Sequence, residues 1–139
     1  MNNSEVDRVF FALLLWREAR GEDFQTKRAV ACSIRNRVEH PSWWGQGWCG
    51  IMFKKWQYSS MTAPNDPNLV KFPQANDTSW IASMDVADEV YNGPMVDSAN
   101  GATHYFDKSL DENPPAWIKA ANMEFIMDSG NFHFYRENH

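Results

Sequence analysis

Residues 9–23 have the sequence VFFALLLWREARGED, and the first half of this stretch decides the fold. The apolar run from Phe10 to Trp16 is unbroken, so it leaves almost no polar face for solvent. A helix of this kind must be enclosed by the rest of the molecule. We therefore predict a central, buried helix over residues 4–20, followed by Gly21, a residue suited to the position after the last helical turn.

Glu18 continues the apolar face of this helix, because it lies four residues after Leu14. A carboxylate on such a face is either paired or used for chemistry. Burial and the negative end of the helix dipole both oppose its charge, so we expect a raised pKa. An acid that stays protonated near neutral pH can protonate the leaving oxygen of a glycosidic bond. The alternative is a structural ion pair with Arg17, Arg20 or Arg35.

The rest of the chain predicts two further helices. One spans residues 24–39, and Asp23 can cap its first turn. The other spans residues 79–92 and is stopped by Gly93-Pro94. The predicted apolar face of this last helix consists of Ile81, Met84, Ala87 and Tyr91.

A small antiparallel β element is expected near the C-terminus. The predicted strands cover residues 102–106, 124–127 and 132–136, and the last two flank a hairpin signal, Asp128-Ser129-Gly130-Asn131. Two loops, residues 41–50 and 62–78, separate the helices. We predict an α+β, mainly helical fold in a single domain over residues 1–139, with a cleft between helices and sheet and Glu18 at its base.

Composition narrows the class of function. A net charge of −5 disfavours nucleic acid and anionic lipid as partners. The apolar run is too short to span a bilayer and does not follow a basic region, so neither membrane insertion nor a signal peptide is expected. Aromatic rings are abundant: five of the seven Trp lie between residues 43 and 80, where they either fill a core or stack on sugars. Pairing of Cys32 with Cys49 stays open.

Several motifs together resemble one family. The signature begins with Glu18-Ala19-Arg20-Gly21-Glu22 and continues with Ala29-Val30-Ala31, Ile34 and Asn36-Arg37-Val38. Later elements are Gln57-Tyr58-Ser59, Gly93, Gly101-Ala102-Thr103-His104-Tyr105-Phe106, Trp117, Gly130 and Phe134-Tyr135. In this order they resemble the SleB/CwlJ-type cell-wall hydrolases over residues 18–135. Where that family has a His two places before its closing aromatic pair, this chain has Phe132, and His133 is adjacent.

The resemblance implies a function for Glu18. In that family the first Glu of the signature is taken as the catalytic acid. The family is similar to lytic transglycosylases and lysozymes, which implies a lysozyme-like fold and cleavage between N-acetylmuramic acid and N-acetylglucosamine. Glu22 and Asp23 are expected to hold a turn and to cap a helix, so no second acid is evident. We therefore favour the lytic transglycosylase route over a muramidase, since the former needs a single acid.

The substrate-binding residues implied alongside Glu18 are Gln57, Tyr58, Ser59, His104, Tyr105 and Trp117. Their polar groups would bind N-acetyl groups and hydroxyls, and their rings would stack on the sugars. Strand alternation places His104 and Tyr105 on opposite faces, so only one of them is expected to face the cleft.

The expected partner is therefore the glycan strand of peptidoglycan, bound by a monomer without a cofactor. The four His residues are scattered and form no short ligand pair, so no metal site is expected. A compact lysin without a signal peptide resembles a phage endolysin, which is made in the cytoplasm and reaches the wall or periplasm through a holin. Two alternatives are a metal-dependent peptidoglycan amidase or peptidase and a non-catalytic wall-binding module.

Overall fold

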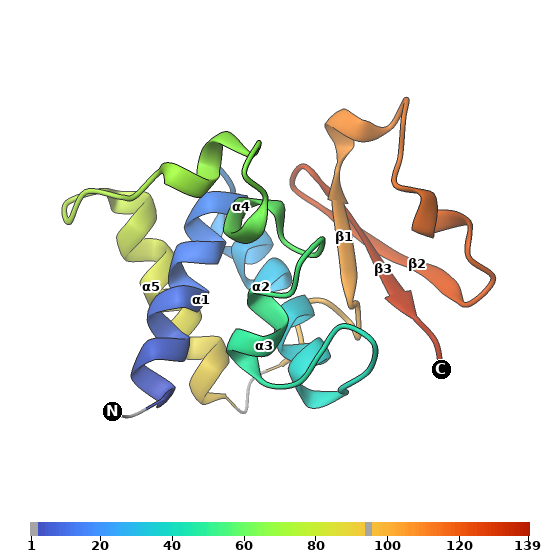
Figure 1. The fold of residues 1–139 in the computed structure, drawn as a ribbon, viewed down its shortest axis with the longest axis horizontal. Coiled ribbons are helices and arrows are strands. Elements are labelled where there is room, and N and C mark those ends of the chain that lie inside the picture. Colours follow the sequence, from blue (N-terminus) through green and yellow to red (C-terminus); the bar gives the residue numbers. More distant parts are fainter. Residues whose placement is uncertain (1–2, 94–95) are drawn as a thin grey trace.

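The computed structural model describes residues 3–93 and 96–139, in which a group of helices packs beside a small sheet (Figure 1). The α-helices are α1 (Asn3–Ala19), α2 (Phe24–Glu39), α3 (Trp48–Met52), α4 (Ser59–Thr62) and α5 (Thr78–Asn92). The strands are β1 (His104–Asp107), β2 (Met123–Ser129) and β3 (Phe132–Glu137). Short 3-10 turns are η1 (Pro67–Val70), η2 (Lys108–Leu110) and η3 (Ala116–Lys119). The mainly helical α+β fold is the predicted one.

The long helices form where the sequence predicts them. The side chain of Asp23 accepts a hydrogen bond from the Thr26 amide over 2.9 Å, which is the predicted cap of α2. The predicted loops are more regular than expected, because α3 begins inside the first and η1 lies inside the second. In the described ranges, no helix is both long and apolar enough to cross a membrane.

The buried face of α5 agrees only in part with the predicted one: Ala87 is buried and Tyr91 packs against the core, as expected. Ser83, Val86, Ala87 and Val90 are buried, whereas Ile81 is 43% exposed and Met84 is 36% exposed. The face was mispredicted because it includes a serine, whose hydroxyl donates to the Ser79 carbonyl and is therefore satisfied without water. Gly93 caps this helix, as expected, while Pro94 lies outside the described residues.

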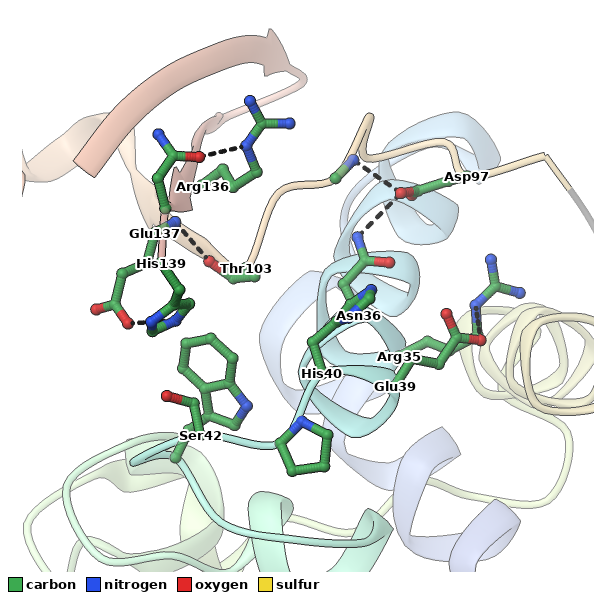
Figure 2. A pocket seen from close by; sticks show the side chains of 14 residues that line it. Arg35, Asn36, Glu39, His40, Ser42, Asp97, Thr103, Arg136, Glu137 and His139 are labelled. Carbon is green, nitrogen blue, oxygen red and sulfur yellow. Dashed lines mark hydrogen bonds and ion pairs between the residues drawn. The ribbon is translucent and has the colours of Figure 1, made fainter. Parts of the chain in front are cut away.

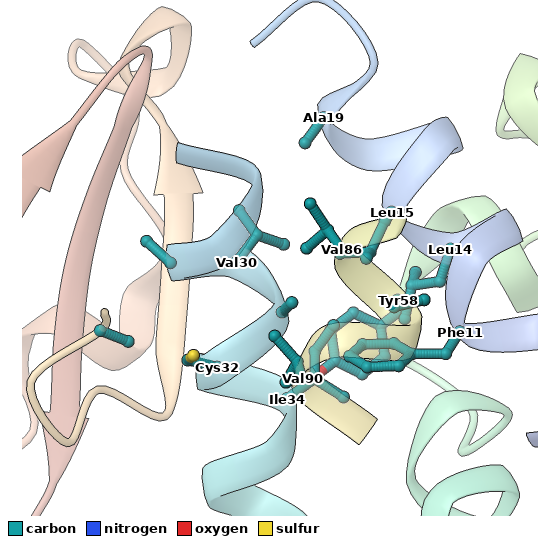
Figure 3. Close-up of a cluster of buried hydrophobic side chains, with 14 of the residues drawn as sticks. Phe11, Leu14, Leu15, Ala19, Val30, Cys32, Ile34, Tyr58, Val86 and Val90 are labelled. Carbon is teal, nitrogen blue, oxygen red and sulfur yellow. The ribbon is translucent and has the colours of Figure 1, made fainter. Parts of the chain in front are cut away.

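The core lies between α1, α2 and α5. Figure 3 shows Phe11, Leu14 and Leu15 of α1 facing side chains of the other two helices. Val30 and Ile34 of α2 meet them there, and all five of these side chains are almost fully buried. Burial of each side chain of this size contributes about 1.5–3 kcal/mol. The apolar run of α1 is therefore enclosed, as predicted, and it fixes the position of Glu18 one turn further on.

The sheet presents its edge strand to the helices. Strand order is β1-β3-β2, and all pairings are antiparallel. At the β2–β3 turn, Gly130 has a positive φ of 51°, and a Cβ there would lie 2.7 Å from Glu22 Oε2. The hairpin turn therefore packs closely on the start of α2. Strand β1 is the strand nearest the helices in Figure 1, and its Tyr105 bonds Glu18 at the end of α1.

Candidate active site

Glu18 lies in the last turn of α1 and lines a small cavity. This cavity, of about 90 Å³, is lined by Glu18, Arg37, Gln57, Tyr58, His104, Tyr105 and Trp117. The structure thus brings together residues from two helices, a loop, a strand and the turn that carries Trp117. Glu18 is the only carboxyl group among these lining residues.

The structure does not show Glu18 in its alternative role, a structural ion pair with Arg17, Arg20 or Arg35. Arg17 donates instead to the carbonyls of Ser60 and Lys71, over 3.0 and 3.1 Å. Arg20 donates to Asn68, and Arg35 pairs with Glu39. The three arginines that could have neutralised Glu18 are therefore engaged elsewhere.

Burial raises the pKa of Glu18, as the sequence predicts, and the negative charge of Asp66 adds to the increase. The hydroxyls of Ser60 and Tyr105 lower the pKa of this carboxyl, but burial is the larger effect. Glu18 is only partly buried, so its raised pKa is combined with access to a ligand. A protonated, reachable acid is what general acid catalysis requires.

Tyr105 determines which oxygen of Glu18 carries the proton. Its hydroxyl donates to Glu18 Oε1 over 2.8 Å. Burial and the charge of Glu18 raise the pKa of Tyr105 well above its ordinary value, so the phenol keeps its proton and acts as a donor. Oε1 is thus occupied as an acceptor, and Oε2 is the oxygen left to hold a transferable proton.

Arg37 also lines the cavity, although the sequence motifs predicted no role for it. It is 6% exposed. Its Nε donates to the Thr103 carbonyl and its Nη1 to Gln57 Oε1, both over 2.5 Å. Arg37 therefore joins α2 to the start of β1 and to the loop before α4. The sequence did contain an indication of this role. Arg37 lies three residues after the buried Ile34, and a charged side chain on that buried face needs partners.

His104 is buried and neutral. It is 4% exposed, its Nδ1 shares a hydrogen with Thr103 Oγ1 over 2.9 Å, and its ring centroid lies 4.9 Å from that of Trp117. Burial, and secondarily the charge of Arg37, lowers the pKa of His104 to about 3. His104 is thus not a proton donor near neutral pH; it can position a ligand or support Trp117.

Both His104 and Tyr105 line the cavity, so the expectation that only one of them would do so is wrong. Their side chains do leave opposite faces of β1. However, β1 is the edge strand, and a cavity at an edge can be reached from both faces.

The three residues of the Gln57-Tyr58-Ser59 element have different positions. Gln57 Nε2 donates to the carbonyls of Trp44 and Ile51, over 2.9 and 3.0 Å, so its amide braces the cavity wall. Tyr58 is 4% exposed and lies in the wall. Ser59 does not line the cavity: it is exposed, and its hydroxyl donates to Asp66 Oδ2 over 2.6 Å. The first turn of α4 points Ser59 outward and turns Ser60 inward.

Glu22 and Asp23 have the structural roles expected of them. Glu22 Oε1 accepts a hydrogen bond from the Asn131 amide over 3.1 Å and so holds the β2–β3 turn. Asp23 caps α2. Asp66, which no sequence motif indicated, is the other carboxylate whose charge acts on Glu18. It accepts hydrogen bonds from the Asn68 amide and the Ser59 hydroxyl.

A larger cavity, of about 970 Å³, lies between the end of α2 and the end of β3 (Figure 2). Its polar side chains are largely paired with one another, as Asn36 is with Asp97 and His139 with Glu137. Glu18 does not line it. Its volume alone would favour the larger cavity as the active site. The raised pKa of Glu18 and the accessibility of this acid favour the smaller cavity instead.

Within residues 3–93 and 96–139, no three His, Cys, Asp or Glu side chains gather as they would around a metal ion. Cys32 and Cys49 are both free thiols. Cys49 donates to Asp7 Oδ1, and burial raises the pKa of its thiol to about 11.

Comparison with known proteins agrees with this fold. The sequence model of a family described as cell wall hydrolase matches residues 21–135. Its match begins three residues after Glu18 and therefore does not include that residue. No curated protein matches the chain.

Two solved structures share the fold. The catalytic domain of the germination-specific lytic transglycosylase SleB from Bacillus anthracis has a TM-score of 0.69 and 23% identity, with 92% of each chain covered. The catalytic domain of the Bacillus cereus SleB protein has a TM-score of 0.67 and 23% identity, covering 92% of this chain and 88% of that one.

Proposed function

Because the chain belongs to the cell wall hydrolase family, we propose that it cleaves the glycan strands of bacterial peptidoglycan with Glu18 as its catalytic acid. The bond cleaved joins N-acetylmuramic acid to N-acetylglucosamine. The single observation that carries this proposal is the Glu18 carboxyl, whose pKa is raised by burial and which accepts a hydrogen bond from Tyr105 in a cavity between helices and sheet.

In the first step, Glu18 Oε2 gives its proton to the glycosidic oxygen as the bond to the muramic acid C1 breaks. Glu18 becomes a carboxylate, and the Tyr105 hydroxyl stabilises this charge through its bond to Oε1. The leaving N-acetylglucosamine departs with a new hydroxyl group.

The second step is proposed to be that of a lytic transglycosylase. The 6-hydroxyl of the muramic acid attacks its own C1, and the Glu18 carboxylate takes the proton of that hydroxyl. The product is a 1,6-anhydro sugar, and Glu18 is protonated again. Two observations support this route over hydrolysis by a muramidase. Among the residues that the structure describes, Glu18 is the only carboxyl lining the cavity, and a lytic transglycosylase domain shares the fold.

Aromatic side chains around the cavity provide surfaces for sugar rings. Trp117 lines the cavity and is partly exposed. Trp43 is 52% exposed, and its ring centroid lies 6.0 Å from that of His104. We assign sugar binding to this aromatic wall together with Gln57, Tyr58 and Tyr105.

The cellular role proposed is that of a phage-type endolysin, a monomer that reaches the wall through a holin. Support comes from the family, whose substrate lies outside the cytoplasm. Expression in a bacterial host with and without a holin tests this role. Lysis only with the holin is expected, and lysis without it would contradict holin-dependent release. Sedimentation equilibrium should give the mass of a single chain.

The decisive experiment is mass spectrometry of purified peptidoglycan after digestion, with Glu18→Gln as the control. Anhydro-muramic ends are expected. Reducing muramic ends would mean a muramidase, and reducing glucosamine ends would mean cleavage of the other glycosidic bond. New peptide termini with intact glycans would mean an amidase or peptidase, and loss of activity with a strong chelator would point the same way. No cleavage at all, with binding retained, would indicate a wall-binding module.

A further inference from the structure

Ser60 carries a buried hydroxyl with no ordinary hydrogen bond. Its side chain is 0% exposed, and Oγ has no partner at normal hydrogen-bond geometry. Buried hydroxyl groups nearly always have a partner, because burial removes the water that would otherwise bind them. A buried hydroxyl without one needs an explanation.

The buried serines of the long helices behave differently. Ser83 donates to the Ser79 carbonyl over 2.8 Å, and Ser33 donates to the Val30 carbonyl over 2.6 Å. Each uses a carbonyl from the preceding helical turn. Ser60 has no such turn before it, because α4 begins at Ser59. The position of Ser60 in a four-residue helix therefore leaves its hydroxyl free for another group.

The main chain of Ser60 is fixed against the end of α1. Arg17, which is 7% exposed, donates from Nη1 to the Ser60 carbonyl over 3.0 Å. The same guanidinium donates from Nε to the Lys71 carbonyl and thereby closes the segment after α4 onto α1. Arg17 precedes Glu18 directly, so residue 60 is anchored beside the acid. The hydroxyl of Ser60 is near enough to Glu18 to lower the pKa of its carboxyl.

We propose that Ser60 is a positioning residue for Glu18, with a buried hydroxyl that has no other acceptor and stabilises the Glu18 carboxylate once its proton has left. This inference rests on the proposed function, in which Glu18 alternates between acid and carboxylate. The proton of Glu18 passes to the glycosidic oxygen, and the proton of Ser60 stays on its own oxygen. Tyr105 bonds Oε1 throughout, so Ser60 supplies the second donor when the charge appears. When Glu18 regains its proton, the Ser60 bond is released.

The test compares Ser60→Ala, Ser60→Thr and the control Ser83→Ala for stability and for the pH dependence of peptidoglycan cleavage. Ser60→Ala should keep or gain stability, because it removes an unpaired buried hydroxyl. Its kcat should fall about tenfold with KM unchanged, since a hydrogen bond to a charged group is lost. The alkaline limb of its pH profile should move upward, because Glu18 loses a group that lowers its pKa.

The two other variants separate this role from a packing role. Ser60→Thr retains the hydroxyl and should restore both kcat and the pH limb. Ser83→Ala loses a bonded hydroxyl, so it should lose stability but keep both kinetic properties. Wild-type kinetics for Ser60→Ala would overturn the proposal, as would an increase in KM with an unchanged kcat, which would instead mean substrate contact.

A direct titration distinguishes failure of this inference from failure of the proposed function. Carbon NMR of the Glu18 side-chain carboxyl gives its pKa in the resting protein without any substrate. Ser60→Ala should raise this pKa even if the chain proves not to cleave glycans. An unchanged Glu18 pKa in Ser60→Ala would overturn the role of Ser60, whatever reaction the protein catalyses.

Discussion

The Tyr105 hydroxyl donates a hydrogen bond to Glu18 Oε1 over 2.8 Å and so joins residues that are 87 positions apart in the chain. Glu18 is the last charged residue of α1, and Tyr105 belongs to the edge strand β1. This bond therefore crosses between the helices and the sheet. Because the phenol keeps its proton and donates it to Oε1, the carboxyl is orientated with Oε2 as its free oxygen.

Replacing Tyr105 by Phe tests this orientation. The ring remains to pack, and only the donor is lost. A hydrogen bond to a charged group contributes about 1.5–3 kcal/mol, so kcat should fall roughly ten- to hundredfold. The alkaline limb of the pH profile should move upward, because the Tyr105 hydroxyl lowers the pKa of Glu18. Kinetics of purified wall digestion between pH 4 and pH 9 would show both effects. A profile that coincides with that of the wild type would refute the role of this bond.

Loss of charge should reduce cleavage at Glu18 and leave it unchanged at Glu22. Glu18→Gln removes the transferable proton and should reduce cleavage by roughly 10²- to 10⁴-fold, the usual contribution of a general acid. Glu22→Gln retains an oxygen that can accept from the Asn131 amide, so both cleavage and stability should stay near those of the wild type. Turbidity clearance and thermal melting measure the two properties. Equal losses in both variants would mean that the turn, and not an acid, limits activity.

The central helix and its acid could be predicted because the signal was local. An unbroken apolar run demands enclosure, and Glu18 lies one turn beyond Leu14 on the same face. The cap of α2 was predictable for the same reason, since Asp23 acts on a residue three positions away.

The remainder of the site depends on long-range arrangement. Whether Ser59 or Ser60 turns inward depends on where α4 begins, and a four-residue helix has no hydrophobic period to reveal its start. The place of Arg37 depends on the Thr103 carbonyl, 66 positions away. That both His104 and Tyr105 reach one cavity follows from β1 being an edge strand, and the order of the strands is not written in any single segment.

His104 should stay neutral throughout the working range of the protein. Its pKa is lowered to about 3 by burial and by Arg37, so no protonation is expected between pH 5 and pH 8. The imidazole carbon and proton shifts of His104 should therefore stay constant in a two-dimensional NMR titration over this range. A His104 titration with a midpoint near 6.5 would show that the ring is hydrated and not enclosed by Trp44 and Trp117.

His133 should make the stability of the fold depend on pH. It is held between two carboxylates, with Nδ1 2.5 Å from Asp128 Oδ1 and Nε2 2.7 Å from Asp111 Oδ1. The hydrogen bond with Asp128, followed by that with Asp111, raises the pKa of His133. A group whose pKa is higher in the folded state stabilises that state below its unfolded pKa, and this contribution disappears as the pH rises through the folded value.

Urea unfolding at pH 5.5, 7 and 8.5 measures this contribution. The free energy of unfolding of the wild type should decrease from about pH 6.5 upward, the ordinary pKa of an unfolded His. His133→Asn should lack this decrease, and the exposed His40→Asn should retain it. Because Asp111 precedes the turn that carries Trp117, release of His133 would also loosen the aromatic wall, and Trp fluorescence should report this at the same pH. Parallel stability curves for the wild type and His133→Asn would show that the bridge between Asp111 and Asp128 contributes nothing to the fold.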